Sequence, residues 1–227
     1  MLSFILFSRG FYHRSLFFIE ARGDKNMTNT QKKHFSTKEI AKIAILGAIA
    51  FVLMQFDFPL PVAPSFYKLD FSEVAVLVGG FAMGPAAGVA IEALKVVLST
   101  LFTGSGTMYV GEVANFLIGC AFVVPASVVY KKNKSKKSAI TGLVLGTVVM
   151  TVFGVFVNFG ILLPAYSYFY HLPLETIISM GQAIFPIIHS TFTFALVCVS
   201  LFNIIKGIVV SIVTVLLYKH ISPLLHR

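Results

Sequence analysis

The sequence predicts an all-α polytopic membrane protein with six transmembrane helices and both termini in the cytoplasm. Two observations support this fold class. Of the 227 residues, 57% are hydrophobic and only 12% are charged, whereas soluble domains are about 25% charged. The hydrophobic residues gather in runs of the length that crosses a bilayer, and the basic residues lie mainly in the short segments between those runs.

The predicted helices correspond to six apolar runs, which are residues 43–56, 71–83, 85–102, 109–130, 139–163 and 202–218. The second run is short for a full span, and we expect Glu73 near its start to lie at the water interface. Asp70 and Glu73 have the spacing of a capping box, in which two residues three apart bond to each other's backbone amides at the start of a helix. A weaker run at 183–201 is the alternative seventh span.

The basic residues favour six spans over seven, because cytoplasmic loops carry the excess of lysine and arginine. Several lysines precede the first span, KKNKSKK (131–137) follows the fourth, and Lys219 and Arg227 follow the last. Six spans place these three groups on one side, whereas seven would move the C-terminal group across. Residues 164–201 then form a long external connection between helices five and six. This segment is too apolar for a solvated loop, and we expect a partly ordered lid.

The first 26 residues differ from the rest of the chain. Their apolar block lies at the extreme N-terminus, without a basic segment before it or a convincing small-residue cleavage site after it, so a signal peptide is not expected. We interpret residues 1–26 as an unstructured or mis-started extension and Met27 as the true start. Residues 27–227 are predicted to form a single membrane domain. The mass of the intact native protein tests this interpretation, because a mass that includes Met1 contradicts it.

Catalysis, metal binding and nucleic-acid binding are not predicted. The pattern GxxxxGK[ST] is absent, and TGSGTMYVGE (103–112) lacks the lysine that would hold a phosphate, so we expect a tight external turn there. No HExxH, GxSxG or cluster of metal ligands occurs. Cys120 and Cys198 are interpreted as small core residues. The net charge of +9 is attributed to membrane topology, because the lysines lie in loops and termini.

A few polar residues interrupt the spans, and each needs a partner because polar groups in hydrocarbon are costly. Glu92 and Lys95 lie three apart on one helix face and are interpreted as an internal ion pair. The other candidates are Glu112, Asn115, Asn158, Asn203 and Lys206. By the six-span topology the asparagines and Lys206 fall in the external half, where they would converge on one cavity. Hydrogen bonding between helices is the alternative for each asparagine.

Aromatic residues near these positions indicate the ligand that such a cavity would take. They are Phe56, Phe58, Phe66, Tyr67, Phe116, Phe159 and Tyr166. Ligand pockets combine apolar walls with a few placed polar groups, and two asparagines can bind a planar amide-like edge because each has a donor and an acceptor. A flat, largely neutral heterocycle therefore fits, and an ion does not.

One face of the first span consists of small residues, namely Ala41, Ala44, Gly47 and Ala48. Small residues allow another helix to approach closely. The residues alone leave two interpretations open, which are packing within the protein and docking of a partner subunit.

Three segments of the sequence resemble the RibU family, the riboflavin-specific substrate-binding (S) subunits of energy-coupling factor (ECF) transporters of Gram-positive bacteria. The segments are residues 58–95, 103–119 and 202–227. They contain DFS, GPAAG, IEALK, GEVANF and FNIIK in the order of the family. The resemblance covers most of the chain from about residue 38 onward.

The resemblance implies a six-helix fold in the cell membrane that captures riboflavin from the extracellular side with high affinity. Delivery would occur by ATP-driven toppling with the coupling protein EcfT and the ATPases EcfA and EcfA′. Riboflavin would be cargo and not a cofactor, and FMN and flavin analogues are further candidate ligands. The resemblance places Asn158, Asn203 and Lys206 against the flavin ring. It assigns Ala44 and Ala48 to the docking motif for the coupling subunit.

Two other classes of function stay as alternatives at this point. A stand-alone secondary transporter for a small aromatic solute would not need ATPases, but the chain has no internal repeat and few buried carboxylates. A membrane scaffold without a ligand would use the alanine face only. Uptake by the purified chain alone would favour the first alternative, and failure to bind any small molecule would favour the second.

Overall fold

The computed structural model describes residues 35–106, 108–171 and 173–225. By its internal contacts the chain divides into Met1–Ser36 and Thr37–Arg227, and all the elements described below belong to the second unit. The extension predicted for residues 1–26, with the start at Met27, lies outside the described residues.

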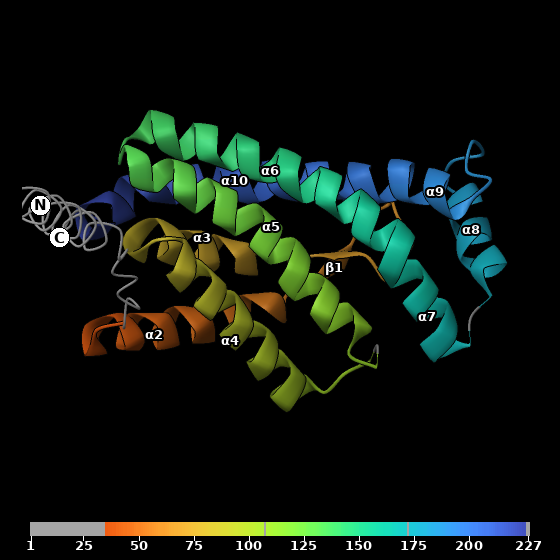
Figure 1. The fold of residues 1–227 in the computed structure, drawn as a ribbon, viewed down its shortest axis with the longest axis horizontal. Coiled ribbons are helices and arrows are strands. Elements are labelled where there is room, and N and C mark those ends of the chain that lie inside the picture. The colour runs from red at the N-terminus through yellow and green to blue at the C-terminus, as the bar shows by residue number, and fades with distance from the viewer. Residues whose placement is uncertain (1–34, 107, 172, 226–227) are drawn as a thin grey trace, which may run out of the picture. The chain divides into compact units, whose positions relative to one another are not determined.

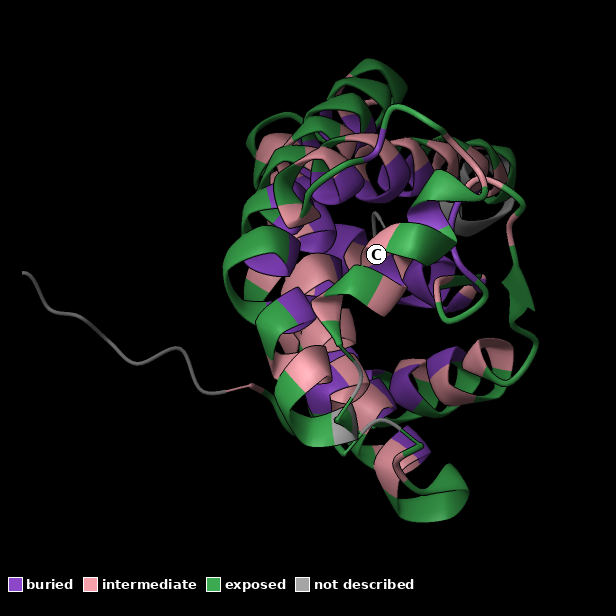
Figure 2. Cartoon of the chain, turned by 90° about the vertical axis from the view of Figure 1, so that its right-hand side faces the viewer, coloured by how far each residue is buried: buried purple, intermediate pink, exposed green. Residues whose placement is uncertain are grey.

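The second unit is all-α apart from one short hairpin, which confirms the all-α part of the predicted fold class. Its elements are α2 (Thr37–Met54), β1 (Phe58–Pro59), β2 (Lys68–Leu69), α3 (Ser72–Met83), α4 (Pro85–Thr103), α5 (Val110–Lys132), α6 (Lys136–Val157), the π-helical turn η1 (Asn158–Leu162), α7 (Leu163–Tyr170), α8 (Leu174–Gln182), α9 (Thr191–Phe194), the π-helical turn η2 (Ala195–Val199) and α10 (Ser200–Leu225). The long helices form a bundle (Figure 1), and the buried residues lie on the sides of the helices that face its interior (Figure 2).

Four helical segments of the described chain are long and apolar enough to cross a membrane. They are Pro85–Thr103, Val110–Lys132, Lys136–Phe169 and Thr191–Leu217. Helix α3 is apolar but has only 12 residues, and α2 has 18 residues with three charged side chains near its start. Each of the six predicted runs therefore corresponds to helix, and four of these segments have the length and composition of a span.

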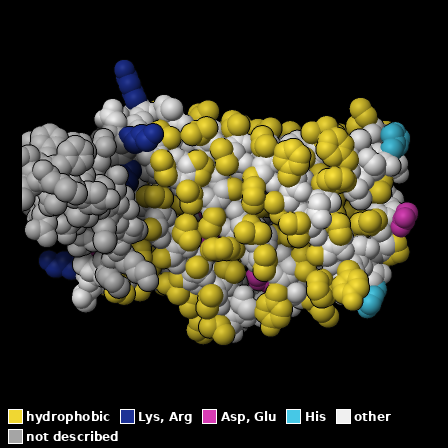
Figure 3. All heavy atoms as spheres, viewed as in Figure 1, with side chains coloured by type: hydrophobic (Ala, Val, Ile, Leu, Met, Phe, Trp, Pro, Cys, Tyr) yellow, Lys and Arg dark blue, Asp and Glu magenta, His cyan; other side chains and the backbone are white. Residues whose placement is uncertain are grey.

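The surface of the bundle agrees with a membrane environment. Apolar side chains cover its middle, and basic side chains gather at one end, where α2 begins and α5 joins α6 (Figure 3). Exposed histidines lie at the opposite end, beside α7 and α9. A contiguous apolar surface of this extent is typical of a protein that contacts lipid.

The connection predicted for residues 164–201 is much shorter in the structure. The helix of the fifth predicted run continues through η1 and α7, and the last helical segment already begins at Thr191. Only residues 171–190 connect the two, and they contain α8, so the expectation of a partly ordered segment holds for this shorter stretch. The weaker apolar run at 183–201 belongs largely to the last helix and is not a seventh span.

Local chemistry explains why these helices are longer than the sequence indicated. Pro164 lacks an N–H and would clash with the carbonyl of residue 160 in a regular α-helix. Pro164 lies in the first turn of α7, just after the wider turn η1, so the helix continues through this turn and does not end. The last helix begins with a capping box, in which Ser190 Oγ accepts from Thr193 N at 3.2 Å and Thr193 Oγ1 accepts from Ser190 N at 2.9 Å.

The capping box predicted for Asp70 and Glu73 is absent. Asp70 Oδ1 accepts instead from Ser72 N at 2.8 Å, and the N-cap residue of α3, Phe71, forms no side-chain capping hydrogen bond. Glu73 is only 1% exposed, so its expected place at the water interface is also wrong. Its carboxylate turns inward because the ammonium group of Lys95 on α4 lies 2.9 Å away. This partner is 22 residues distant and does not show in a local pattern.

The close packing of α5 against α6 depends on glycine. A Cβ on Gly142 would lie 2.6 Å from the carbonyl oxygen of Ala126, and backbone cannot move aside as a flexible side chain can. We therefore expect Gly142→Ala to lower the free energy of unfolding by about 1–3 kcal/mol. Thermal unfolding in detergent measures this effect. Gly160→Ala is the matched control, because nothing lies within 4 Å of that position, and an equal loss of stability in both variants would contradict the packing argument.

Candidate functional site

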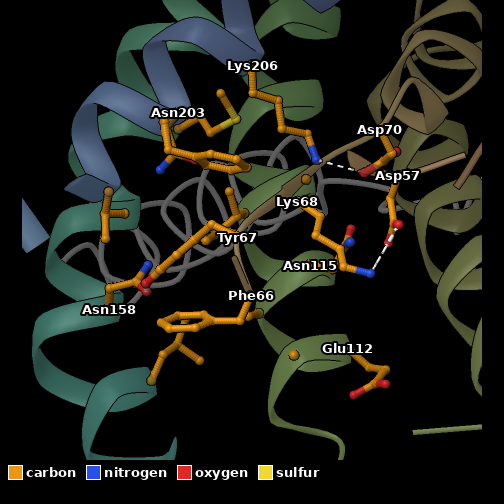
Figure 4. A pocket seen from close by; sticks show the side chains of 18 of the residues that line it. Asp57, Phe66, Tyr67, Lys68, Asp70, Glu112, Asn115, Asn158, Asn203 and Lys206 are labelled. Carbon is orange, nitrogen blue, oxygen red and sulfur yellow. Dashed lines mark hydrogen bonds and ion pairs between the residues drawn. The ribbon is translucent and has the colours of Figure 1, made fainter. Parts of the chain in front are cut away.

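A cavity of about 360 Å³ lies among α3, α5, α6, α10 and the segment that joins α2 to α3. Its volume is within the range of about 300–1,000 Å³ that is usual for small-molecule sites. The five candidate site residues of the sequence analysis line it, namely Glu112, Asn115, Asn158, Asn203 and Lys206 (Figure 4), whereas Glu92 and Lys95 do not. These side chains come from α5, η1 and α10 and are up to 94 residues apart in the sequence. The sequence analysis expected the asparagines and Lys206 to meet in one cavity.

One end of the cavity is formed by Asn158 of η1 and Asn203 of α10, with Tyr67 between them (Figure 4). The Tyr67 hydroxyl donates to Asn158 Oδ1 at 2.6 Å, and Asn158 Nδ2 donates to the carbonyl of Gly154 at 2.8 Å. Desolvation raises the pKa of the Tyr67 hydroxyl well above its ordinary value, so this group stays a neutral donor. The ring of Tyr67 also packs against Phe202, with 5.5 Å between the centroids.

The side-chain amide of Asn203 has fewer hydrogen-bond partners than that of Asn158. Its side chain is 2% exposed, and its Nδ2 has no hydrogen-bond partner within the described part of the chain. A Cβ on Gly154 would lie against this nitrogen, so the glycine leaves room for the amide in this orientation. A buried amide without a full set of partners is costly unless a ligand completes it.

Lys206 lies one helical turn beyond Asn203 and pairs with Asp70, with 3.2 Å between Nζ and Oδ2. Burial alone would raise the pKa of the Asp70 carboxyl, but the charges of Lys206 and Lys95 lower it to about 2. Asp70 is therefore ionised at neutral pH. The carboxylate of Asp70 thus compensates the charge of Lys206, whose ammonium group lies at the cavity wall.

The opposite wall is formed by α3 and α5. Glu112 Oε2 accepts from the hydroxyl of Ser105 at 3.0 Å. Asn115 Oδ1 accepts from Lys95 Nζ at 3.1 Å, and the same ammonium lies 2.6 Å from Glu92 Oε1 and 2.9 Å from Glu73 Oε1. The predicted ion pair of Glu92 and Lys95 is thus confirmed. Sequence reasoning missed Glu73, which joins this cluster and lines the cavity.

Only part of the predicted aromatic wall is present. Phe66, Tyr67 and Tyr166 line the cavity, together with Phe202, which the sequence analysis did not single out. The four others that were expected there do not line it, namely Phe56, Phe58, Phe116 and Phe159. Phe56 is 68% exposed. Nearness in the sequence did not determine which way these rings point.

The small-residue face of α2 divides into two parts. Gly47 is buried, and a Cβ there would lie 2.5 Å from Leu94 Cδ2, so this glycine serves packing against α4. Ala44 and Ala48 are exposed. Apolar side chains flank them on the same helix, with Ile45 61% exposed. These alanines therefore stay open to a partner outside the chain.

Comparison with known protein families identifies the chain. Residues 38–218 match the family described as ECF transporter, substrate-specific component. The chain belongs to the substrate-specific (S) components of ECF transporters. This confirms the family resemblance of the sequence, and it places the chain among multi-pass membrane transport proteins, which are not enzymes.

Individual S components agree with this assignment. The chain is 40% identical over 195 residues to the riboflavin transporter RibU of Staphylococcus aureus, covering 84% of this chain and 93% of the relative. It is 36% identical over 187 residues to the riboflavin transporter FmnP of Bacillus subtilis, covering 82% and 93%. The solved S component of a bacterial ECF transporter superposes with a TM-score of 0.64 at 38% identity, covering 84% of this chain and 98% of that one.

Proposed function

We propose that this S component binds riboflavin from the extracellular side of a Gram-positive cell membrane and delivers it to an ATP-driven ECF module. The observation that carries the proposal is the cavity in which Asn158, Asn203 and Lys206 face aromatic side chains. The two relatives named above are riboflavin transporters at 36% and 40% identity. Riboflavin would be transported cargo, and FMN and flavin analogues are further candidates.

The flavin ring would lie at the asparagine end of the cavity. Its uracil-like edge carries both carbonyl acceptors and an N–H donor, and asparagine amides match such an edge because each has one acceptor and two donors. Lys206 would add a cationic donor beside this edge, while Phe66 and Tyr166 would cover the apolar faces of the ring. Glu112 and Asn115 would contact the substrate from the opposite wall.

The binding side follows from the orientation of α5. Glu112 lies in the first turn of this helix, while Lys131 and Lys132 lie in its last turn. At 1.5 Å per residue the two ends are about 30 Å apart. The positive-inside rule places the lysines in the cytoplasm, so the cavity opens toward the extracellular side. We extend this orientation to six spans, with α2 and α3 completing the set and both ends inside.

Delivery requires partners, because the chain has no ATP-binding motif. We propose that exposed Ala44 and Ala48 dock on the coupling protein EcfT, and that the ATPases EcfA and EcfA′ drive toppling of the S component in the membrane. Reconstitution in liposomes tests this proposal. We expect riboflavin uptake only when the S component, the coupling protein, both ATPases and ATP are all present. Uptake by the S component alone would favour a stand-alone secondary transporter.

Riboflavin affinity should not vary between about pH 5 and pH 8. The pKa of Asp70 is lowered from 3.8 to about 2, so its pair with Lys206 is fully formed above the ordinary pKa and is lost only as the pH falls toward 2. His171 and His189 do not line the cavity. Fluorescence titrations at several pH values measure the affinity. A tenfold change within this window would show that another group titrates in the site.

A further inference from the structure

A groove runs between α6 and α10 on the outside of the bundle, and none of the residues that line it lines the substrate cavity. Two hollows of about 310 Å³ and 510 Å³ lie along it. Both are lined by Val144, Ser211 and Ile212, so they form one continuous groove. The two helices lie side by side (Figure 1) and approach closely at Gly207, where a Cβ would lie 2.5 Å from Thr147 Cγ2.

The walls of the groove are apolar and face outward. Most of the residues that line it are valine, isoleucine or leucine, and Val144 at its centre is 60% exposed. The hydroxyls of Thr147 and Thr151 each donate to the backbone carbonyl four residues earlier, at 2.9 Å and 2.8 Å, so they need no partner from a ligand. Both helices belong to segments with the length and composition of a membrane span. Hydrocarbon therefore fills the groove in a bilayer, since an empty hollow would forfeit dispersion contacts.

The length of the groove matches one leaflet of the bilayer. Along α6 the groove extends from Ile140 to Val152, which is about 18 Å at a rise of 1.5 Å per residue. The hydrocarbon of one leaflet is about 15 Å thick, because the whole hydrocarbon core measures about 30 Å. One acyl chain of a lipid whose headgroup lies near the Ile140 end would therefore extend along the whole groove.

Two lysines lie at the Ile140 end of the groove. Lys136 and Lys137 precede Ile140 by four and three residues, so they lie on the same face of α6 as the groove. Both are exposed, and neither takes part in an ion pair among the residues that the structure describes. The positive-inside rule places this end in the cytoplasm, where the leaflet carries anionic lipids. The charges of the two lysines thus complement a lipid phosphate at this end of the groove.

We propose that the groove binds an anionic phospholipid of the cytoplasmic leaflet, with one acyl chain between α6 and α10 and the phosphate on Lys136 and Lys137. Acyl chains are alike in being apolar, so the groove fixes the chain while the lysines select the negative headgroup. The proposed docking helix α2 packs against α3 and α4, on the other side of the bundle in Figure 1, so this lipid and the coupling protein can bind together. The inference goes beyond the proposed function and does not depend on riboflavin.

A tryptophan introduced into the groove tests this inference, because the chain has none of its own. Leu216→Trp places the reporter at an exposed position beside Ile140. The protein is reconstituted in mixed bilayers of phosphatidylcholine and phosphatidylglycerol, with bromine on the acyl chains of one lipid or the other. Quenching of the tryptophan fluorescence then gives the relative affinity of the two lipids. We expect phosphatidylglycerol to bind about fivefold or more tightly, because each lysine near the membrane surface contributes a preference of about fivefold for an anionic lipid.

Three further changes in this reporter protein separate the headgroup from the chain. Lys136→Gln combined with Lys137→Gln should make the two lipids bind equally. Lys38→Gln combined with Lys42→Gln is the matched control, because it removes two exposed lysines from α2, and it should leave the preference unchanged. Val144→Phe fills the centre of the groove and should also remove the preference, because the chain is then displaced. A preference that survives the loss of Lys136 and Lys137, or survives Val144→Phe, would overturn the inference.

A second reporter distinguishes the groove from the general attraction of lysines for anionic lipids. Ile45→Trp lies at an exposed position on α2, and it should show a smaller preference than the groove reporter. An equal preference at both positions would overturn the inference, as would a groove reporter that neither brominated lipid quenches, because protein would then cover the groove. Should Leu216→Trp not fold, Ile212→Trp replaces it. None of the substituted residues lines the substrate cavity, so a failure of the folded wild-type protein to bind riboflavin would contradict the proposed function alone.

Discussion

Asn203→Ala is expected to lower the affinity for riboflavin by about 1–3 kcal/mol, which is roughly five- to hundredfold. Asn203 is 2% exposed and lines the cavity. Its removal would leave a polar edge of the flavin buried without a partner. Quenching of riboflavin fluorescence by the purified variant measures the loss.

The control for this variant is Asn133→Ala, which makes the same chemical change at the exposed end of α5. It should bind riboflavin as the wild-type protein does. Circular dichroism and thermal unfolding would establish that both variants are folded. Wild-type affinity in folded Asn203→Ala would remove this residue from the proposed site.

Ala48→Leu is expected to abolish ATP-driven uptake while riboflavin binding stays unchanged. Ala48 is exposed on α2 and does not line the cavity. A leucine there would prevent another helix from approaching closely, because such contacts depend on small side chains. Copurification of the variant with the coupling protein and the ATPases measures assembly, and liposome uptake measures transport.

Ala86→Leu provides the comparison for the docking surface. Ala86 is also an exposed alanine and lies near the start of α4, so this change adds the same apolar volume outside α2. The Ala86 variant should assemble and transport normally. Normal uptake by Ala48→Leu would reject the docking role of the alanine face.

The sequence predicted the membrane fold and the residues of the cavity because both depend on simple periodic signals. Apolar runs mark the helices, and the positions of Asn158, Asn203 and Asn115 within those runs fix their depth. Residues at one depth on neighbouring helices tend to meet, and the structure brings these three to one cavity. The motifs GEVANF and FNIIK indicated the family, because hydrophobic periodicity alone does not identify one.

The errors arose where a local pattern competes with contacts distant in the sequence. The fifth predicted run ended at residue 163, directly before Pro164, but the π-helical turn η1 allows the helix to continue past this proline. Glu73 had the spacing of a cap, but the ammonium of Lys95 draws it into the interior. The contact of Tyr67 with Asn158 joins residues 91 positions apart. No sequence window that reports local periodicity contains either pair.

The most direct measurement is an absorbance spectrum of the protein purified in detergent, followed by titration with riboflavin while its fluorescence is recorded. Our account predicts flavin bands in the purified protein or stoichiometric quenching of added riboflavin. A folded protein that carries no flavin and quenches none would contradict the proposed substrate. The cavity formed by Asn158, Asn203 and Lys206 would then have to serve another flat molecule.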